Sequence, residues 1–331
     1  MNRTLLTRRL ATLCLLAAPL WVSAQTAPKT LRLVVPFPAG GATDLLARSL
    51  AQRLGQGLGQ GLGTTVVVEN RAGAGGTLGS AEVAKAAPDG NTLLLSTSST
   101  HAVGPHLSTN LPYKALGPDM DFTPIAHVAN APNVVLVPLT LPVSNIKELI
   151  AYAKARPGQL NYASSGNGTI VHLTAEAFKT QAGVFITHIP YRGTALSIPD
   201  LVSGKVHLLF DSVVSGMPHV KDGKLKALAV TSDTRSALAP ELPTVAESGL
   251  PGFVSNTWFG VYAPKGLPAE LTARLNAEIN AALKSPEVQE RFARLGAVPA
   301  PGNTPAQFAA MVAADSQRWA RIIQDRKITA E

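Results

Sequence analysis

The stretch from Leu31 to Arg48, LRLVVPFPAGGATDLLAR, constrains the fold of this chain more than any other. It opens with an apolar run typical of a buried strand, turns through Pro36–Gly41, and continues with leucines near helical spacing. Backbone N–H groups at a helix start lack partners and lie at the positive end of the helix dipole, and glycines let an anion approach them. The stretch therefore predicts a strand, a turn and a helix. Its turn, the first loop (Pro36–Asp44), is either a plain tight connection or a carboxylate site.

Asp44 leaves two interpretations of the first loop open. Its carboxylate falls in the first helical turn, where the helix dipole stabilises negative charge, so it is suited to capping. It would repel a bound carboxylate unless it bonds a hydroxyl or amino group of the ligand, or an ordered water. Both interpretations are kept.

The first residues have the pattern of a secretory signal. A basic start precedes an apolar run from Leu10 to Trp21 and a small-x-small end at Val22–Ala24. We expect residues 1–24 to be a signal peptide, cleaved after Ala24, and the mature chain to lie in the periplasm. The apolar run is too short to span a bilayer, which disfavours the alternative of an uncleaved anchor.

Composition excludes several classes of function. The only cysteine, Cys14, lies inside the signal, so we expect no disulfide, thiol nucleophile or thiolate metal site in the mature chain. Removing the three arginines of residues 1–24 lowers the formal net charge from +8 to +5. The remaining basic residues are scattered, and nucleic-acid binding is therefore not expected.

Strand-like and helix-like segments alternate along the rest of the chain, which indicates α/β domains with mostly parallel sheets flanked by helices. Ligands of such sheets bind outside the carboxyl ends of the strands. The glycine repeat Gly55–Gly63 predicts a frayed helix end or a loop. Asp121–Val128 and Asn133–Val137 predict two separate strands.

The opening pattern recurs after Asn161. A short strand leads into Ser164–Thr169, the second loop, and a helix follows to about Gln181. Two such loops, more than a hundred residues apart, suit the two sides of one binding cleft. Thr97, in the hydroxyl-rich segment Ser96–Thr100, and Asp211 also follow or end predicted strands. Each is suited either to capping and turns or to ligand contact.

Motifs for catalysis and metal binding are missing. No GxSxG elbow contains Ser164 or Ser165, and the seven histidines show no HExxH or comparable spacing. The glycines of Gly73–Gly76 lack the pattern of a phosphate loop. We expect no enzyme activity, no metal and no cofactor.

Seven segments, which follow one another in order along nearly the whole mature chain, resemble those of one family: the extracytoplasmic solute receptors of tripartite tricarboxylate transporters, or Bug family. The segments are Val34–Arg48, Val68–Gly79, Asp121–Val128, Asn161–Leu173, His188–Ser212, Gly223–Ser236 and Leu242–Phe253.

The resemblance implies a two-domain periplasmic binding protein of the Venus-flytrap, type II-like kind, with two interdomain crossovers. Domain 1 comprises residues 25–128 and 253–331, and domain 2 comprises residues 129–252. The resemblance also implies that the two loops hold a carboxylate, partly through ordered waters and backbone N–H groups. The predicted ligand-binding residues are Phe37, Pro38, Ala39, Gly40, Gly41, Ala42, Asp44, Thr97, Ser164, Ser165, Asn167, Thr169 and Asp211.

The resemblance also implies partners. We expect a monomer that delivers a small organic acid to a transporter with one small and one large integral-membrane subunit. The alternative is an orphan periplasmic sensor that passes its liganded state to a signalling protein. Within the family the ligands include di- and tricarboxylates, amino acids, aromatic acids and nicotinate-like compounds, and the sequence does not select among them.

Overall fold

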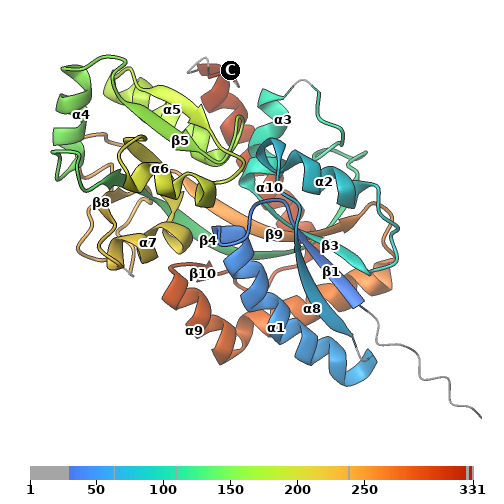
Figure 1. Ribbon diagram of the computed structural model, residues 1–331. Coiled ribbons are helices and arrows are strands. Elements are labelled where there is room, and N and C mark those ends of the chain that lie inside the picture. The colour runs from blue at the N-terminus through green and yellow to red at the C-terminus, as the bar shows by residue number, and fades with distance from the viewer. Residues whose placement is uncertain (1–29, 63, 109, 238, 326–327, 330–331) are drawn as a thin grey trace, which may run out of the picture.

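The computed structural model describes residues 30–331 except 63, 109, 238, 326–327 and 330–331. The predicted signal peptide at residues 1–24 lies outside the described residues. The chain forms two halves side by side, joined by long strands (Figure 1). None of the described helices is both long and apolar enough to cross a membrane.

The first half begins with alternating strands and helices. These are β1 (Thr30–Val35), α1 (Ala42–Leu62), β2 (Thr65–Asn70), the short turn η1 (Ala74–Gly76), α2 (Thr77–Ala84), β3 (Thr92–Thr97), the π-helical turn η2 (Ser99–Val103) and α3 (Gly104–Leu107). The chain later returns to this half with β9 (Asn256–Pro264), α8 (Ala269–Lys284), α9 (Pro286–Leu295), β10 (Val298–Pro299) and α10 (Pro305–Asp325).

The second half lies between these two passages. Its elements are α4 (Ile146–Lys154), β5 (Asn161–Ser164), α5 (Ile170–Ala182), β6 (Thr187–Pro190), η3 (Thr194–Leu196), α6 (Ile198–Val202), β7 (Leu208–Ser212), α7 (Val213–Lys221) and β8 (Leu225–Val230). One continuous core of aromatic and aliphatic side chains runs through both halves, with Tyr162, Phe178 and Phe210 in the second and Leu33, Phe259 and Trp319 in the first.

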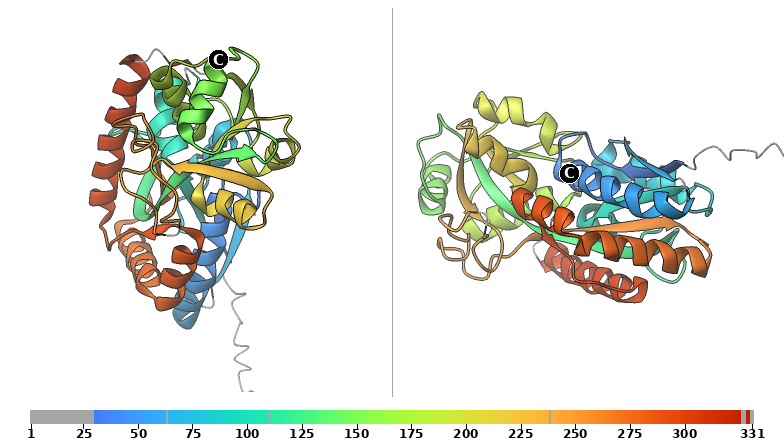
Figure 2. Two further views of the ribbon diagram at one scale, coloured as in Figure 1. Left: turned by 90° about the vertical axis from the view of Figure 1, so that its left-hand side faces the viewer. Right: turned by 90° about the horizontal axis from the view of Figure 1, so that it is seen from below.

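Strand β4 (Phe122–Pro138) belongs to both halves, and Figure 2 shows it running lengthwise through the molecule. It pairs with β9 as far as Pro132 and with β7 and β8 from Asn133 onward. The prediction of two separate strands here is wrong. Pro132 offers no N–H, but the extended ladder continues because the Asn133 N–H donates to Thr231 Oγ1 and the Asn133 carbonyl accepts from the Thr231 N–H. The domain boundaries near Val128 and Phe253 stay predictions.

The sheet is mixed. Strand β1 is parallel to β2 and β3, and β5 is parallel to β6 and β7, as predicted for alternating strands and helices. The pairs that include β4 or β9 are antiparallel, because one strand leaves the first half and the other returns to it. The mostly parallel pairing expected from sequence therefore holds among β1, β2 and β3 and among β5, β6 and β7, while β8 and β10 pair antiparallel with β4.

Helix α1 continues through the glycine repeat to Leu62, so the predicted loop or frayed end is wrong from Gly55 to Leu62, and Gly63 lies outside the described residues. A Cβ at Gly57 would lie 2.7 Å from Glu278 Oε2 on α8. The missing side chain leaves room for the Glu278 carboxylate, and α8 packs against α1. Tertiary contact of this kind overrides the low helix propensity of glycine.

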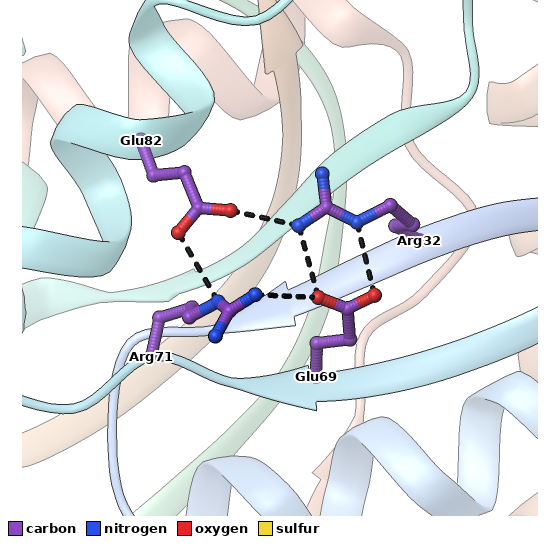
Figure 3. Close-up of polar contacts among 4 residues, drawn as sticks. All are labelled: Arg32, Glu69, Arg71 and Glu82. Carbon is purple, nitrogen blue, oxygen red and sulfur yellow. Dashed lines mark hydrogen bonds and ion pairs between the residues drawn. The ribbon is translucent and has the colours of Figure 1, made fainter.

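Four charged side chains join β1, β2 and α2 at the surface of the first half (Figure 3). Arg32 Nη2 lies 2.9 Å from Glu69 Oε2 and 2.7 Å from Glu82 Oε1, while Arg71 contacts the same two carboxylates at 3.3 and 3.2 Å. The Arg71 N–H also donates to the Val35 carbonyl at 2.8 Å. This ion-pair network therefore fixes the start of the glycine-rich turn Ala72–Gly76 relative to the first loop.

Candidate functional site

A small cavity of about 50 Å³ lies between the two halves. It is lined from both halves and from the point where β4 changes partners. The lining residues are Phe37, Pro38, Gly41, Ala42, Thr43, Thr97, Ser99, Asn133, Ser165, Ile170, Val171, Gly193, Thr194, Ala195, Asp211, Ser212, Thr257 and Phe259.

The first loop forms one wall of the cavity. The Gly41 carbonyl accepts the Leu45 N–H at 3.0 Å, so α1 begins directly after Gly41, and its first residues, Ala42 and Thr43, line the cavity. Gly40 has φ +82°, a left-handed conformation that favours glycine. The turn thus brings a helix start, with unpaired N–H donors, to the cavity wall.

Asp44 stabilises this loop from inside and does not line the cavity. Its side chain is buried, and its Oδ2 accepts from the Gly40 N–H and Arg48 Nε, both at 3.0 Å. Its Oδ1 accepts from Asn70 Nδ2 at 2.9 Å. Burial acts to raise the pKa of Asp44, but the hydrogen bonds from Arg48, Gly40 and Asn70 outweigh it and hold the pKa below its usual value. The geometry favours the capping interpretation.

The second loop forms the opposite wall. Thr169 caps α5: its Oγ1 accepts from the His172 N–H and donates to the Gly166 carbonyl at 2.8 Å. Ser164 Oγ accepts from the Gly166 N–H at 3.0 Å. Ser165 alone of this loop lines the cavity, followed by the first α5 residues Ile170 and Val171.

Three helices begin at the cavity. Ala42 and Thr43 start α1, Ile170 and Val171 start α5, and Ser212 caps α7 by accepting from the Val214 N–H at 3.3 Å. None of the lining residues is Lys, Arg or His. The positive ends of three helix dipoles therefore supply the favourable potential for an anion that a cationic side chain would otherwise provide.

The protein-family model described as "Tripartite tricarboxylate transporter family receptor" matches residues 47–328. The chain belongs to this family. Protein BugT of Bordetella pertussis (strain Tohama I) is 42% identical over 312 residues, which are 94% of this chain and 93% of BugT. The resemblance seen in the sequence is confirmed.

Solved structures of similar proteins support the same assignment. The periplasmic binding protein BugD superposes with a TM-score of 0.84 at 37% identity, over 91% of this chain and 98% of BugD. Rpa4515 of R. palustris with adipate superposes with a TM-score of 0.86 at 37% identity, over 91% of this chain and 99% of Rpa4515. MatC (Rpa3494) from Rhodopseudomonas palustris with bound malate superposes with a TM-score of 0.82 at 35% identity, over 89% of this chain and 98% of MatC. The predicted fold class, a two-domain periplasmic binding protein, is confirmed.

The receptor brings together about half of the predicted ligand-binding residues. Phe37, Pro38, Gly41, Ala42, Thr97, Ser165 and Asp211 line the cavity. Ala39, Gly40, Asp44, Ser164 and Thr169 lie in the two loops without lining it, and Asn167 lines a neighbouring hollow between the halves instead. Which of these residues touch a ligand stays a prediction.

Several lining residues were not predicted. Gly193, Thr194 and Ala195 follow β6, Ser99 lies in η2, and Asn133 and Thr257 lie where β4 and β9 cross between the halves. Gly193, Thr194 and Ala195 lie in His188–Ser212, one of the segments that resemble the family, and this resemblance could have pointed to them. The crossing residues have no local signal, because strand pairing across the molecule brings them to the cavity.

Asp211 is the one acidic residue on the cavity wall. Its side chain is buried, and burial raises its pKa to about 6, against the opposing effect of hydrogen bonds from Ser215, Thr194 and the Ser212 N–H. Ser215 Oγ donates to Asp211 Oδ2 at 2.8 Å. Among the described residues, no Lys or Arg pairs with this carboxyl. An anion in the cavity would therefore meet a carboxyl that titrates near neutral pH.

The two halves of the receptor touch across the cavity. A Cβ at Gly193 would lie 2.3 Å from Pro38 Cδ, and a Cβ at Gly75 would lie 2.9 Å from the Asn167 carbonyl oxygen. The Ile170 N–H donates to Ser99 Oγ at 3.1 Å. These contacts describe a closed arrangement. Within the part of the chain that the structure describes, no group of three His, Cys, Asp or Glu side chains is placed to hold a metal ion.

Proposed function

We propose that this receptor captures a small organic carboxylate between its two halves and carries no catalytic step of its own. The observation that carries the proposal is the convergence of three helix N-termini on a cavity without cationic side chains. Backbone N–H groups and ordered waters would then hold the carboxylate through the two loops. The adipate and malate in similar proteins support a small dicarboxylate as the first compound to test.

Closure follows from the placement of the walls. A ligand in the cavity contacts the first loop and the start of α5 together only when the halves meet, so it stabilises the closed state over an open one. The closed protein would deliver the acid to a membrane transporter with a small and a large subunit. Export with cleavage after Ala24 would place the protein in the periplasm, as its family membership supports.

A thermal-shift screen tests the ligand class. Adipate and malate would each be compared with the corresponding uncharged diamide, which has the same length but no negative charge. An acid at about a hundredfold its Kd adds about 2.7 kcal/mol to the free energy of unfolding. We expect stabilisation by at least one acid and none by its diamide. Equal stabilisation by acid and diamide would contradict the role of the helix ends.

A further inference from the structure

Two stacked histidines lie beneath the second loop. His172 on α5 and His188 on β6 have ring centroids 4.3 Å apart and ring planes inclined by 17°. The Tyr162 ring on β5 stacks on His188 at 4.8 Å. His172 is buried, with 2% of its surface exposed. The rings therefore form a packed layer between the sheet of the second half and the loop.

Both imidazoles hydrogen-bond to the loop itself. The Gly168 N–H donates to His172 Nδ1 at 3.3 Å, and His188 Nε2 lies 2.7 Å from Ser164 Oγ, which accepts from the Gly166 N–H. The backbone N–H of Gly168 can only donate, so His172 Nδ1 must be unprotonated to accept it. A proton on Nδ1 would place two donors face to face and put a charge beside the His188 ring.

The second loop, which the histidines support, both lines the cavity and contacts the first half. Ser165 lines the cavity, while Gly166 and Asn167 contact the turn Ala72–Gly76 of the first half. A Cβ at Gly166 would lie 3.2 Å from both Cα and N of Gly75. This close contact leaves little freedom, so a small change in loop shape alters both the cavity wall and the contact between the halves.

The surroundings favour neutral rings. The charged groups that face the pair are Glu176 and Lys179 on α5, and these neutralise each other through an ion pair of 2.6 Å. Tyr162 donates its hydroxyl hydrogen to Glu176 at 2.5 Å. Burial lowers the pKa of His172 to about 4, with Glu176 opposing it and Lys179 adding to it. The pKa of His188 is also about 4, lowered first by burial and then by His172.

We propose that His172 and His188 are positioning residues of the ligand site, which hold the second loop in its binding shape as a neutral pair and release it when protonated. The inference rests on the proposed function in treating this loop as a ligand wall. The contacts between the histidines and the loop lie within the second half and do not depend on it. The pair adds stability above the ordinary histidine pKa, and this contribution is lost as the pH falls through about 4.

Amide NMR of the ligand-free protein tests the contact directly. The signals of Gly166 and Gly168 would be followed from about pH 7 to about pH 3, below the pKa of about 4, together with the ring signals of the histidines. We expect the Gly168 amide to shift with the titration of His172. In His172→Asn the amide oxygen keeps an acceptor near the position of Nδ1 but takes no proton, so the shift should vanish. His219→Gln on α7, distant from the loop, is the control and should leave the shift unchanged.

Two results would overturn the proposal. One is a Gly168 amide signal that stays constant while His172 titrates, and the other is the same titration of the Gly168 signal in His172→Asn.

A second experiment uses adipate as the probe in calorimetry. His172→Phe, which keeps a ring without an acceptor, should weaken binding about tenfold, and His172→Asn should retain affinity within about twofold. If adipate does not bind the wild type, the ligand assignment fails while the NMR result still decides the role of the histidines.

Discussion

The first and second loops have the same pattern of strand, small-residue turn and helix start, but different groups stabilise them. In the first loop an ionised carboxylate, Asp44, accepts from Gly40, Asn70 and Arg48. In the second loop the neutral rings of His172 and His188 contact Gly168 and Ser164. The carboxylate keeps its charge below its usual pKa, whereas protonation of His172 removes the acceptor of the Gly168 N–H. We therefore expect the first loop to keep its shape in acid and the second loop to change shape as the pH falls.

A substitution where the two walls meet, at Gly193 and Pro38, should have the largest effect on ligand affinity. Gly193→Ala would place its Cβ 2.3 Å from Cδ and 2.6 Å from Cγ of Pro38, and all the close atoms at this position belong to Pro38. Each half can still fold, but the halves cannot close fully. We expect the affinity for adipate to fall about a hundredfold by calorimetry, with an almost unchanged melting temperature without ligand.

A second substitution sharpens this prediction. Pro38→Ala removes Cδ and Cγ and leaves Cβ, which would lie at an ordinary contact distance of 3.7 Å. The double variant Pro38→Ala/Gly193→Ala should therefore bind better than Gly193→Ala alone. If the single variant binds as tightly as the wild type, the walls do not need this contact.

Removing the support of the first loop should have the next largest effect. Asp44→Ala leaves the Gly40 N–H, Asn70 and Arg48 without their shared acceptor, and we expect a loss of about 2 kcal/mol in the free energy of unfolding. The control is Glu82→Gln in the partly exposed ion-pair network, which should cost less than about 1 kcal/mol. Equal losses in urea denaturation would contradict the role of Asp44 as an internal support.

Asp211 should have a smaller effect on ligand affinity, and this effect should depend on pH. Its pKa is raised, so its protonated form is favoured in the fold, and this contribution to stability is lost as the pH rises through about 6. An anionic ligand nearby should favour the protonated form further. We expect affinity for adipate, relative to the variant Asp211→Asn, to rise about tenfold from about pH 7 to about pH 5. The variant accounts for the titration of the ligand itself, and parallel pH profiles of the two proteins would contradict the prediction.

Local patterns predicted the parts of the site that one chain segment builds. The apolar run, the turn and the helix start in Leu31–Arg48 and Asn161–Leu173 lie next to each other in sequence, and both loops formed as expected. At the start of α10 the Gln307 N–H donates to Thr304 Oγ1 and the Thr304 N–H donates to Gln307 Oε1, a capping box that one chain segment builds. Short-range hydrogen bonds and hydrophobic periodicity are sufficient for such elements.

Long-range packing decided the rest. Asn133 and Thr257 reach the cavity through the pairing of β4 with β7 and β9, which no local pattern encodes. The stack of His172 on His188 depends on the register of β5 against β6, where Tyr162 pairs with His188. Gly57 lies in a helix, where the Glu278 side chain of α8 comes close to it. In each case the partner lies far away in sequence.

Calorimetry of Gly41→Val tests most directly whether backbone groups at the start of α1 help to hold a carboxylate. The added side chain would block approach to the helix start, while Gly302→Val in a distant loop, where a Cβ has ordinary contacts, is the matched control. We expect adipate or malate to bind the wild type and Gly302→Val alike, and Gly41→Val to lose binding while its melting temperature stays nearly unchanged. Unchanged affinity of Gly41→Val for the same acid would contradict this expectation.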